Sequence, residues 1–167
     1  DVECYINDPL TMNDRDSFYW HSEMLCRLIE FYGTRGIRVR GRMTPKTEAR
    51  IMDALWLWAE HNAKISLADF TQSHTWWIRI SENHHAQYFS TAWHFARLAV
   101  LLQHNSCDRK YEDGSTVAEQ YAAWTAYIRE YCLERARKGL FTEVGSDNYN
   151  AVSLKGFYNI YDFTEDP

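Results

Sequence analysis

The sequence predicts an all-α fold, and two features of the chain lead to this prediction. Apolar residues recur every three or four positions along most of the 167 residues, which is the period of amphipathic helices. Residues that begin and end helices stand at the borders of these stretches. Because 46% of the residues are hydrophobic, the chain can bury a core, and its length suits one domain. We expect residues 1–167 to form a single all-α domain.

The first predicted helix covers residues 14–32. One stripe of it, with spacings of 3, 4, 3 and 4, consists of Phe18, His21, Leu25, Leu28 and Tyr32. Gly33 is expected to end the helix as its C′ residue. The next segment, 34–43, is basic and contains Arg35, Arg38, Arg40 and Arg42. Because Ile37 and Val39 alternate with three of these arginines, we expect a loop or a short extended piece with the arginines on one side.

The second predicted helix begins at Thr44-Pro45, since an N-cap residue followed by proline is a strong start signal, and it runs to Asn62. Its inward-facing residues are expected to be Ile51, Met52, Leu55, Trp56, Trp58 and Ala59. Residues 63–80 are less regular, and their last six residues suit an extended segment or one turn of helix.

A long third helix is expected after the cap residue Ser81, over residues 82–103. A polar loop from 105 to 115 follows it. This loop contains Asp113-Gly114-Ser115, a sequence typical of turns.

Two further helices complete the predicted set. Thr116 caps the fourth helix, which ends before Gly139. Its apolar stripe consists of Tyr121, Trp124, Ile128, Tyr131 and Arg135. After a turn at Gly145, the last helix spans residues 150–163.

Five helices with short connections suggest stacked antiparallel hairpins. An (α/α) solenoid or toroid fits this pattern, with the chain as an incomplete part of it, and a free-standing bundle is the competing architecture. The chain starts without Met and ends without a closing element. We therefore expect it to be a fragment of a larger protein.

Charge and cysteine usage exclude several classes of function. The net charge of −5 argues against a general nucleic-acid surface, which needs a dense basic face. No apolar run reaches the roughly 18 residues of a membrane span. The 4 cysteines contain no C-x-x-C pair, which excludes a zinc ribbon, and Cys26 and Cys132 are expected to be buried thiols. Three pairings of the four stay open, and no metal or cofactor is expected.

Asn83 and His84 stand side by side at the start of the third predicted helix. Free backbone N–H groups at a helix start disfavour an added positive charge, so a histidine there tends to stay neutral and can act as a base. An asparagine beside it can hydrogen-bond a substrate carboxylate. The competing interpretation is that both residues only cap the helix.

Tyr149 follows a glycine-containing turn, just before the last predicted helix. A phenol can donate or accept a proton when a neighbouring cation or imidazole stabilises its phenolate. Taken alone, the residue is better explained by packing against the next helix.

Together, these two segments resemble the (α/α) toroid domain of polysaccharide lyases of the heparinase and alginate-lyase type. Those proteins carry an Asn-His pair at a helix start and a catalytic tyrosine in a downstream Glu-Gly-Ser-Pro-x-Tyr-like segment. Here the pair is Asn83-His84, and the downstream segment runs from Glu143 to Tyr149, with Asp147 in place of the family's proline. The form Ser-Glu-Asn-His and the segment from Tyr158 to Phe163 also resemble uncharacterised bacterial toroid proteins.

The resemblance covers residues 76–166 and implies β-elimination at a uronic acid. Asn83 would neutralise the C6 carboxylate, His84 or Tyr149 would remove the C5 proton, and Tyr149 would protonate the leaving glycosidic oxygen. The implied partner is an acidic polysaccharide, and the implied larger protein would be secreted or periplasmic. An arginine assists in such enzymes, and the candidates, each also explained as a surface charge, are Arg79, Arg135 and Arg137.

Five further side chains are candidates for substrate binding: Trp76, Trp77, Arg79, Glu143 and His21. The tryptophans could stack on sugar rings or pack in the core. His21 could face a toroid cavity or be a satisfied core histidine. The arginines of segment 34–43 could bind an acidic polymer or lie in solvent.

Two other functions stay open. A glycoside hydrolase of toroid fold would use two carboxylates, for which Glu23 and Glu82 are candidates. A non-catalytic carbohydrate-binding or scaffold domain would need Asn83 and His84 only as helix caps.

Overall fold

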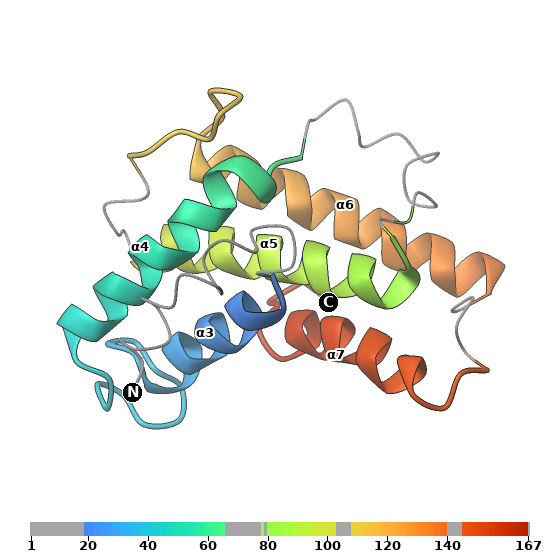
Figure 1. Cartoon of the computed structure of the whole chain (residues 1–167), viewed down its shortest axis with the longest axis horizontal. Helices are drawn as coiled ribbons and strands as arrows, with labels where there is room; N and C mark the ends of the chain where they lie inside the picture. The colour runs from blue at the N-terminus through green and yellow to red at the C-terminus, as the bar shows by residue number, and fades with distance from the viewer. Residues whose placement is uncertain (1–18, 66–77, 79, 103–107, 140–144, 167) are drawn as a thin grey trace.

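The computed structural model describes residues 19–65, 78, 80–102, 108–139 and 145–166 (Figure 1). This part of the chain forms five α-helices and no strand: α3 (Tyr19–Tyr32), α4 (Pro45–Asn62), α5 (Glu82–Leu102), α6 (Val117–Lys138) and α7 (Tyr149–Tyr161). The all-α prediction is confirmed. The expected start of the first helix, residues 14–18, lies outside the described residues. So does most of segment 75–80, which the sequence predicts to be extended or one turn of helix.

Helix α5 is the centre of the molecule. It contacts each of the other four described helices (Figure 1). Most of its side chains are buried. One aromatic cluster shows how α5 joins its neighbours: Phe89 packs against Tyr127 and Tyr131 of α6 and Phe157 of α7. Because α5 is covered on all sides, it carries no wide polar face of the kind that surface helices have.

Helices α3 and α7 run in the same direction as α5. Two pairs of contacting residues show this for α3: Tyr19 with His84, and Glu30 with His94. Two pairs show it for α7: Gln87 with Val152, and His94 with Asn159. The first turns of α3, α5 and α7 therefore lie at one end of the bundle.

Helices α4 and α6 run opposite to α5. For α4, Asn62 lies beside Tyr88, and Trp56 lies beside Phe95. For α6, Tyr127 contacts His85, and Thr125 contacts Trp93. Successive helices thus alternate in direction, as they do in stacked helical hairpins. Closure into a toroid stays a prediction.

The predicted caps of two helices are confirmed. The Thr44 hydroxyl accepts a hydrogen bond from the Thr47 N–H at 3.2 Å, and proline follows it. Thr116 forms a capping box with Glu119, in which each side chain accepts from the other residue's backbone N–H. These local contacts explain why both starts could be predicted from the sequence.

Gly33 follows the last residue of α3, as predicted, and it is not among the residues with positive φ. The position requires glycine because there is no room for a side chain. A Cβ atom there would lie 2.6 Å from the Ile29 carbonyl oxygen and would collide with the Glu48 carboxylate. That carboxylate holds the Thr34 N–H and hydroxyl at 2.6 and 2.8 Å, joining α4 to the end of α3.

The basic segment 34–43 is a folded loop of turns, not an extended piece. Its backbone N–H groups bond back to the last turn of α3, with Ile37 donating to Glu30 at 2.8 Å and Met43 donating to Tyr32 at 2.7 Å. These bonds satisfy carbonyl groups that a helix C-terminus leaves open.

Helices α5 and α7 approach each other closely at Gly156. A Cβ atom at this position would lie 2.6 Å from the Ala86 carbonyl oxygen. Helix α7 starts at Tyr149, one residue earlier than expected, and ends at Tyr161. Phe163 follows in a turn and is buried against the His94 ring, with 4.6 Å between centroids.

Candidate functional site

Asn83 and His84 lie in the first turn of α5, where the central helix reaches the surface of the bundle. The Ser81 carbonyl accepts the His85 N–H at 2.9 Å and closes this turn. Asn83 is buried and His84 is partly exposed. The structure therefore gives the two neighbours different surroundings, although the sequence presents them as an equal pair.

The His84 imidazole is held by the first two residues of α3. The Tyr19 phenol oxygen lies 2.5 Å from His84 Nδ1, across a separation of 65 residues. The Trp20 ring meets the imidazole edge to face, with centroids 5.1 Å apart. No partner among the described residues bonds His84 Nε2. The ring of this partly exposed residue is thus oriented through Nδ1.

Neither Tyr19 nor Trp20 is predicted from the sequence to be part of the site. Both fall inside the first predicted helix, and neither belongs to its apolar stripe. Tyr19 is 1% exposed and also contacts Tyr88, so by burial alone it is a core residue. Only the packing of α3 on α5 brings its hydroxyl to the histidine.

Tyr149 is the first residue of α7 and is 56% exposed. Its backbone N–H bonds the Ser146 hydroxyl at 3.3 Å. Tyr149 lies one turn before Val152, and His84 lies one turn before Gln87, which donates to the Val152 carbonyl at 2.9 Å. Because the two helices run in parallel, Tyr149 and His84 lie at the same end of the α5–α7 pair.

The other predicted binding residues have different outcomes. Trp76, Trp77, Arg79 and Glu143 lie outside the described residues. His21 is exposed in the first turn of α3, so its interpretation as a core histidine is wrong.

A buried polar cluster lies behind the first turn of α5. Arg135 pairs with Glu82 at 3.0 Å and donates to the Tyr131 hydroxyl at 2.7 Å. Burial raises the pKa of Tyr131 to about 12, and Arg135 opposes that rise. The His85 Nε2 lies 2.8 Å from the Tyr127 hydroxyl. The cluster ties the end of α6 to the start of α5.

The two described arginine candidates differ in exposure. Arg135 is 4% exposed and bound to Glu82, so its interpretation as a surface charge is wrong. Arg137 is a surface residue that lies 3.9 Å from Glu134. Arg135 therefore contacts Glu82, the first residue of α5, and its bonds to Glu82 and Tyr131 do not reach Asn83, His84 or Tyr149.

The two carboxylates considered for hydrolysis are both paired with cations. Glu82 holds Arg135, and the buried Glu23 lies 2.9 Å from Lys155. A hydrolase needs one carboxylic acid and one carboxylate facing the same bond. These two pairings favour a structural role for both side chains.

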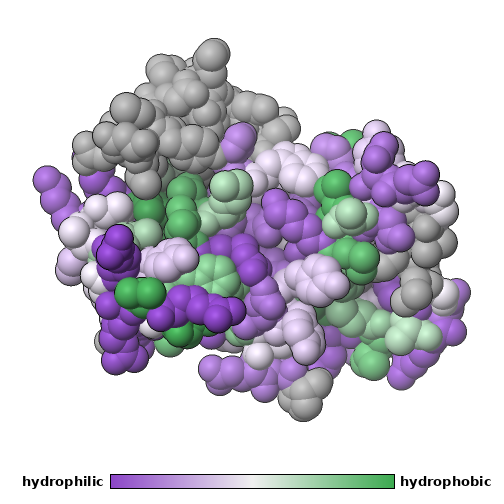
Figure 2. All heavy atoms as spheres, turned by 90° about the horizontal axis from the view of Figure 1, so that it is seen from below, coloured by the Kyte–Doolittle hydropathy of each residue, from purple (hydrophilic) through white to green (hydrophobic). Residues whose placement is uncertain are grey.

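A groove of about 530 Å³ lies between α3 and α7, on the face seen in Figure 2. It is lined by Glu23, Met24, Arg27, Ala151, Lys155, Tyr158 and Asp162. Ala151 is two residues from Tyr149, and Glu23 is one turn from Tyr19. The groove therefore leads away from the end of the bundle that carries His84.

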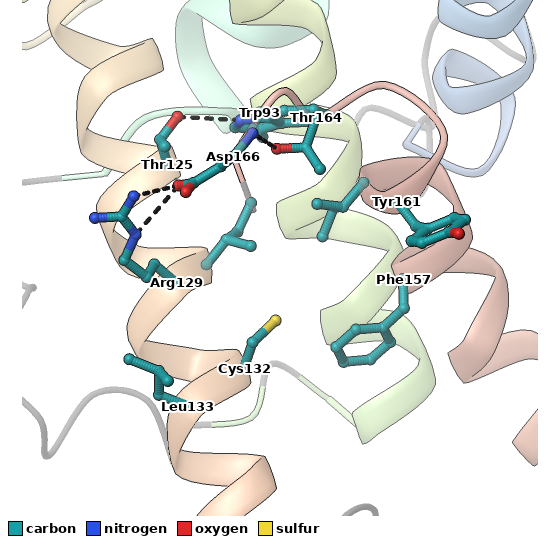
Figure 3. Close-up of a pocket in the computed structure, with 11 residues that line it drawn as sticks. Trp93, Thr125, Arg129, Cys132, Leu133, Phe157, Tyr161, Thr164 and Asp166 are labelled. Carbon is teal, nitrogen blue, oxygen red and sulfur yellow. Dashed lines mark hydrogen bonds and ion pairs between the residues drawn. The ribbon is translucent and has the colours of Figure 1, made fainter.

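A second cavity, of about 390 Å³, lies between α5, α6 and α7 (Figure 3). Its wall is mainly apolar and includes Trp93, Ile128, Cys132, Phe157 and Ile160. Arg129 and Asp166 pair at one edge of it, with contacts of 2.5 and 3.1 Å. None of the predicted site residues lines this cavity.

Metal chemistry and reactive thiols find no support in the described ranges. They contain no group of three or more side chains suited to hold a metal ion. Cys26 and Cys132 are free thiols, the first buried and the second partly buried. Burial raises the pKa of both, that of Cys132 to about 11, which keeps them protonated at neutral pH. None of the described helices is long and apolar enough to cross a membrane.

Comparisons with known proteins add no assignment. No family model, no curated protein and no solved structure matches the chain.

Proposed function

We propose that the chain belongs to a polysaccharide lyase of the (α/α) toroid type, which cleaves a uronic-acid polymer by β-elimination. The observation that carries the proposal is the His84 imidazole, oriented by the Tyr19 hydroxyl at 2.5 Å, beside Asn83 and at the same end of the bundle as Tyr149. An oriented imidazole with one nitrogen open is what a general base requires.

In this reaction, His84 Nδ1–H donates to the Tyr19 oxygen, which leaves the lone pair of Nε2 for the substrate. Nε2 takes the C5 proton of the uronate, and the electron pair of that C–H bond forms the C4–C5 double bond. The C4–O bond breaks, and Tyr149 gives its proton to the leaving oxygen. Asn83 donates to the C6 carboxylate and stabilises the charge that develops there.

The test follows the C4–C5 double bond by its ultraviolet absorbance. Alginate, heparan sulfate, chondroitin sulfate, hyaluronan and pectate are offered as substrates. We expect Tyr149→Phe to lower kcat by about 100-fold or more, since that is the usual contribution of a general acid or base. Tyr19→Phe should lower kcat by about tenfold and shift the pH profile of kcat, because it removes only the group that orients His84.

Unchanged melting temperatures of both variants are the control for folding. The matched control for losing a hydroxyl is Tyr161→Phe, an exposed tyrosine at the opposite end of α7 from Tyr149, which should keep full activity. Wild-type activity in Tyr149→Phe would reject the proposed acid. Release of reducing ends without ultraviolet absorbance would show hydrolysis instead.

The burial of Asn83 favours a second candidate, a carbohydrate-binding domain without catalysis. In such a domain, the only role of Asn83 and His84 is to stabilise the start of α5. Asn83→Ala and His84→Ala would then lower the melting temperature, and the wild-type chain would bind the polymer without cleaving it. Loss of turnover at an unchanged melting temperature would reject this candidate.

A further inference from the structure

The basic loop is an unexplained feature at the far end of α3. Between Thr34 and Thr47 the chain has no acidic residue. Its five cations are all exposed: Arg35, Arg38, Arg40, Arg42 and Lys46. Within the described part of the chain, none of the five forms an ion pair. On a chain of net charge −5, this is a strong local concentration of positive charge.

The loop holds these cations on a folded backbone. Bonds from its N–H groups to Glu30, Phe31, Tyr32 and Gly33 of the α3 end keep it in place, and Gly41 supplies a positive φ of 72°. Arg38 also lies over the Phe31 ring, 5.8 Å from its centroid. A pre-ordered set of charges loses little conformational freedom when it binds a partner.

The chemistry of the loop points to oxyanions. Four of the five cations are arginines, whose planar guanidinium groups bind carboxylate, sulfate or phosphate through two parallel hydrogen bonds. Two aliphatic side chains, Ile37 and Val39, are 62% and 51% exposed among them. The apolar surface of these two side chains is small compared with the apolar face that an amphipathic helix inserts into a membrane. This comparison favours a polymer over a lipid surface.

The position of the loop fits an extended polymer. Helix α3 is 14 residues long, so its two ends are about 20 Å apart. Tyr19 and His84 lie at one end and the basic loop lies at the other (Figure 1). The groove between α3 and α7 lies along the same helix.

We propose that loop 34–43, with Lys46, is an anchoring site for an anionic polysaccharide, separate from the candidate catalytic site. The identity of the polymer rests on the proposed function. The anchoring site binds the carboxylate or sulfate groups of sugar units remote from the bond that is cleaved. It therefore acts on long chains and has no role in the turnover of short ones.

The test measures equilibrium binding of heparan sulfate and alginate to the chain that carries Tyr149→Phe, so that binding is separated from cleavage. The loop variant combines Arg35→Ser, Arg40→Ser and Arg42→Ser. Arg38, which lies over the Phe31 ring, is left unchanged. We expect it to bind about tenfold more weakly or worse, as three exposed ion pairs are lost, and to show a smaller salt dependence. Lysine at the same three positions keeps the charge and should retain more affinity than serine.

Two further arms separate the polysaccharide from other anions. Vesicles of phosphatidylcholine with phosphatidylserine probe a lipid surface, and a DNA duplex probes nucleic acid. A second variant, Ile37→Ser with Val39→Ser, should leave polysaccharide binding within about twofold of wild type, since aliphatic side chains do not bind oxyanions. Melting temperatures equal to wild type show that the variants fold.

Unchanged polysaccharide affinity in the triple serine variant would overturn the proposal. So would tighter binding to the vesicles or to DNA than to either polysaccharide, or no binding of the polysaccharides at all. The proposed function fails separately: a chain that binds polymer through the loop but yields no double bond is no lyase. If the chain is active and the triple serine variant cleaves long polymer with wild-type kinetics, the loop is not an anchoring site.

Discussion

At the scale of single residues, the interior of the bundle contains charged side chains next to opposite charges. Glu30 pairs with Arg97, Glu82 with Arg135 and Glu23 with Lys155. Removing one member of such a pair leaves a buried charge without compensation, which is more costly than removing both. These pairs join α5 to α3 and α6, and α3 to α7, so they contribute to the choice of one arrangement of helices.

His94 is a fully buried histidine within this set. Its Nδ1 lies 2.9 Å from the Asn159 side-chain oxygen, and its Nε2 lies 3.3 Å from Glu30. Burial lowers its pKa, while Glu30 and Asn159 oppose that shift and Arg97 adds to it. The folded protein therefore favours the neutral ring more than the unfolded chain does.

This difference predicts how stability changes with pH. The unfolded chain binds a proton at His94 below a pKa of about 6.5, and the folded chain binds it only at lower pH. His94 thus makes the free energy of unfolding fall as pH drops below about 6.5, and it adds no slope above that value. Urea denaturation from about pH 7.5 to pH 5 should show a smaller fall in His94→Gln than in the wild type.

The control compares the wild type and His94→Gln between about pH 7.5 and about pH 9, above the range in which His94 adds a slope. The two proteins should show equal slopes there. An equal slope in the two proteins below about pH 6.5 as well would show that His94 is not responsible for the acid sensitivity.

At the scale of the elements, the contact between α5 and α7 depends on Gly156. Adding one methyl group there would place it 2.6 Å from the Ala86 carbonyl, a backbone atom that cannot move alone. We expect Gly156→Ala to lower the free energy of unfolding by about 1–3 kcal/mol, the usual cost of overpacking. Thermal or urea denaturation measures it.

Gly145→Ala is the matched control, because nothing lies within 4 Å of a Cβ atom at Gly145 and its φ is not positive. That change should be neutral or slightly stabilising, since alanine restricts the unfolded chain. If Gly156→Ala is as stable as Gly145→Ala, α5 and α7 do not approach each other closely enough at Gly156 to require glycine there.

At the scale of the whole molecule, α5 contacts each of the other four described helices, so we expect these helices to unfold as one cooperative unit. Phe89 is fully buried and contacts α6 and α7 through Tyr131 and Phe157. Phe89→Leu should lower the free energy of unfolding by about 1–2 kcal/mol. Circular dichroism and tryptophan fluorescence should still report one coincident transition, because the helices around α5 cannot keep their packing without it.

Leu133→Ala provides the comparison, since Leu133 is 40% exposed on α6. It should change stability by no more than about 0.5 kcal/mol. Two separate transitions in Phe89→Leu would show that α5 does not couple the helices.

The helices themselves could be predicted because their signals are local. Thr44 and Thr116 cap helices through hydrogen bonds to residues three positions later. The stripes on α4 and α6 followed the helical period, and their residues are buried except for Tyr121, which is partly buried. Segment 34–43, predicted as a loop or a short extended piece, is a loop, because its backbone bonds to the end of α3 and not to a strand.

The candidate site could be predicted only in part. Asn83 and His84 were found from their place at a helix start, which is a local feature. Tyr19 could not be found, since its hydroxyl meets His84 across 65 residues. The same holds for Arg135, whose charge looked solvent-exposed until Glu82 was found beside it.

The sequence by itself determined the helices, their caps and the basic loop, because each depends on residues a few positions apart. The tertiary structure decided which helix is central, that α3, α5 and α7 start at one end, and which side chains surround His84. Those facts depend on how helix faces pack, and packing joins residues that the order of the chain keeps far apart. The same physical difference separates the helix start at Asn83 from the site that Tyr19 completes.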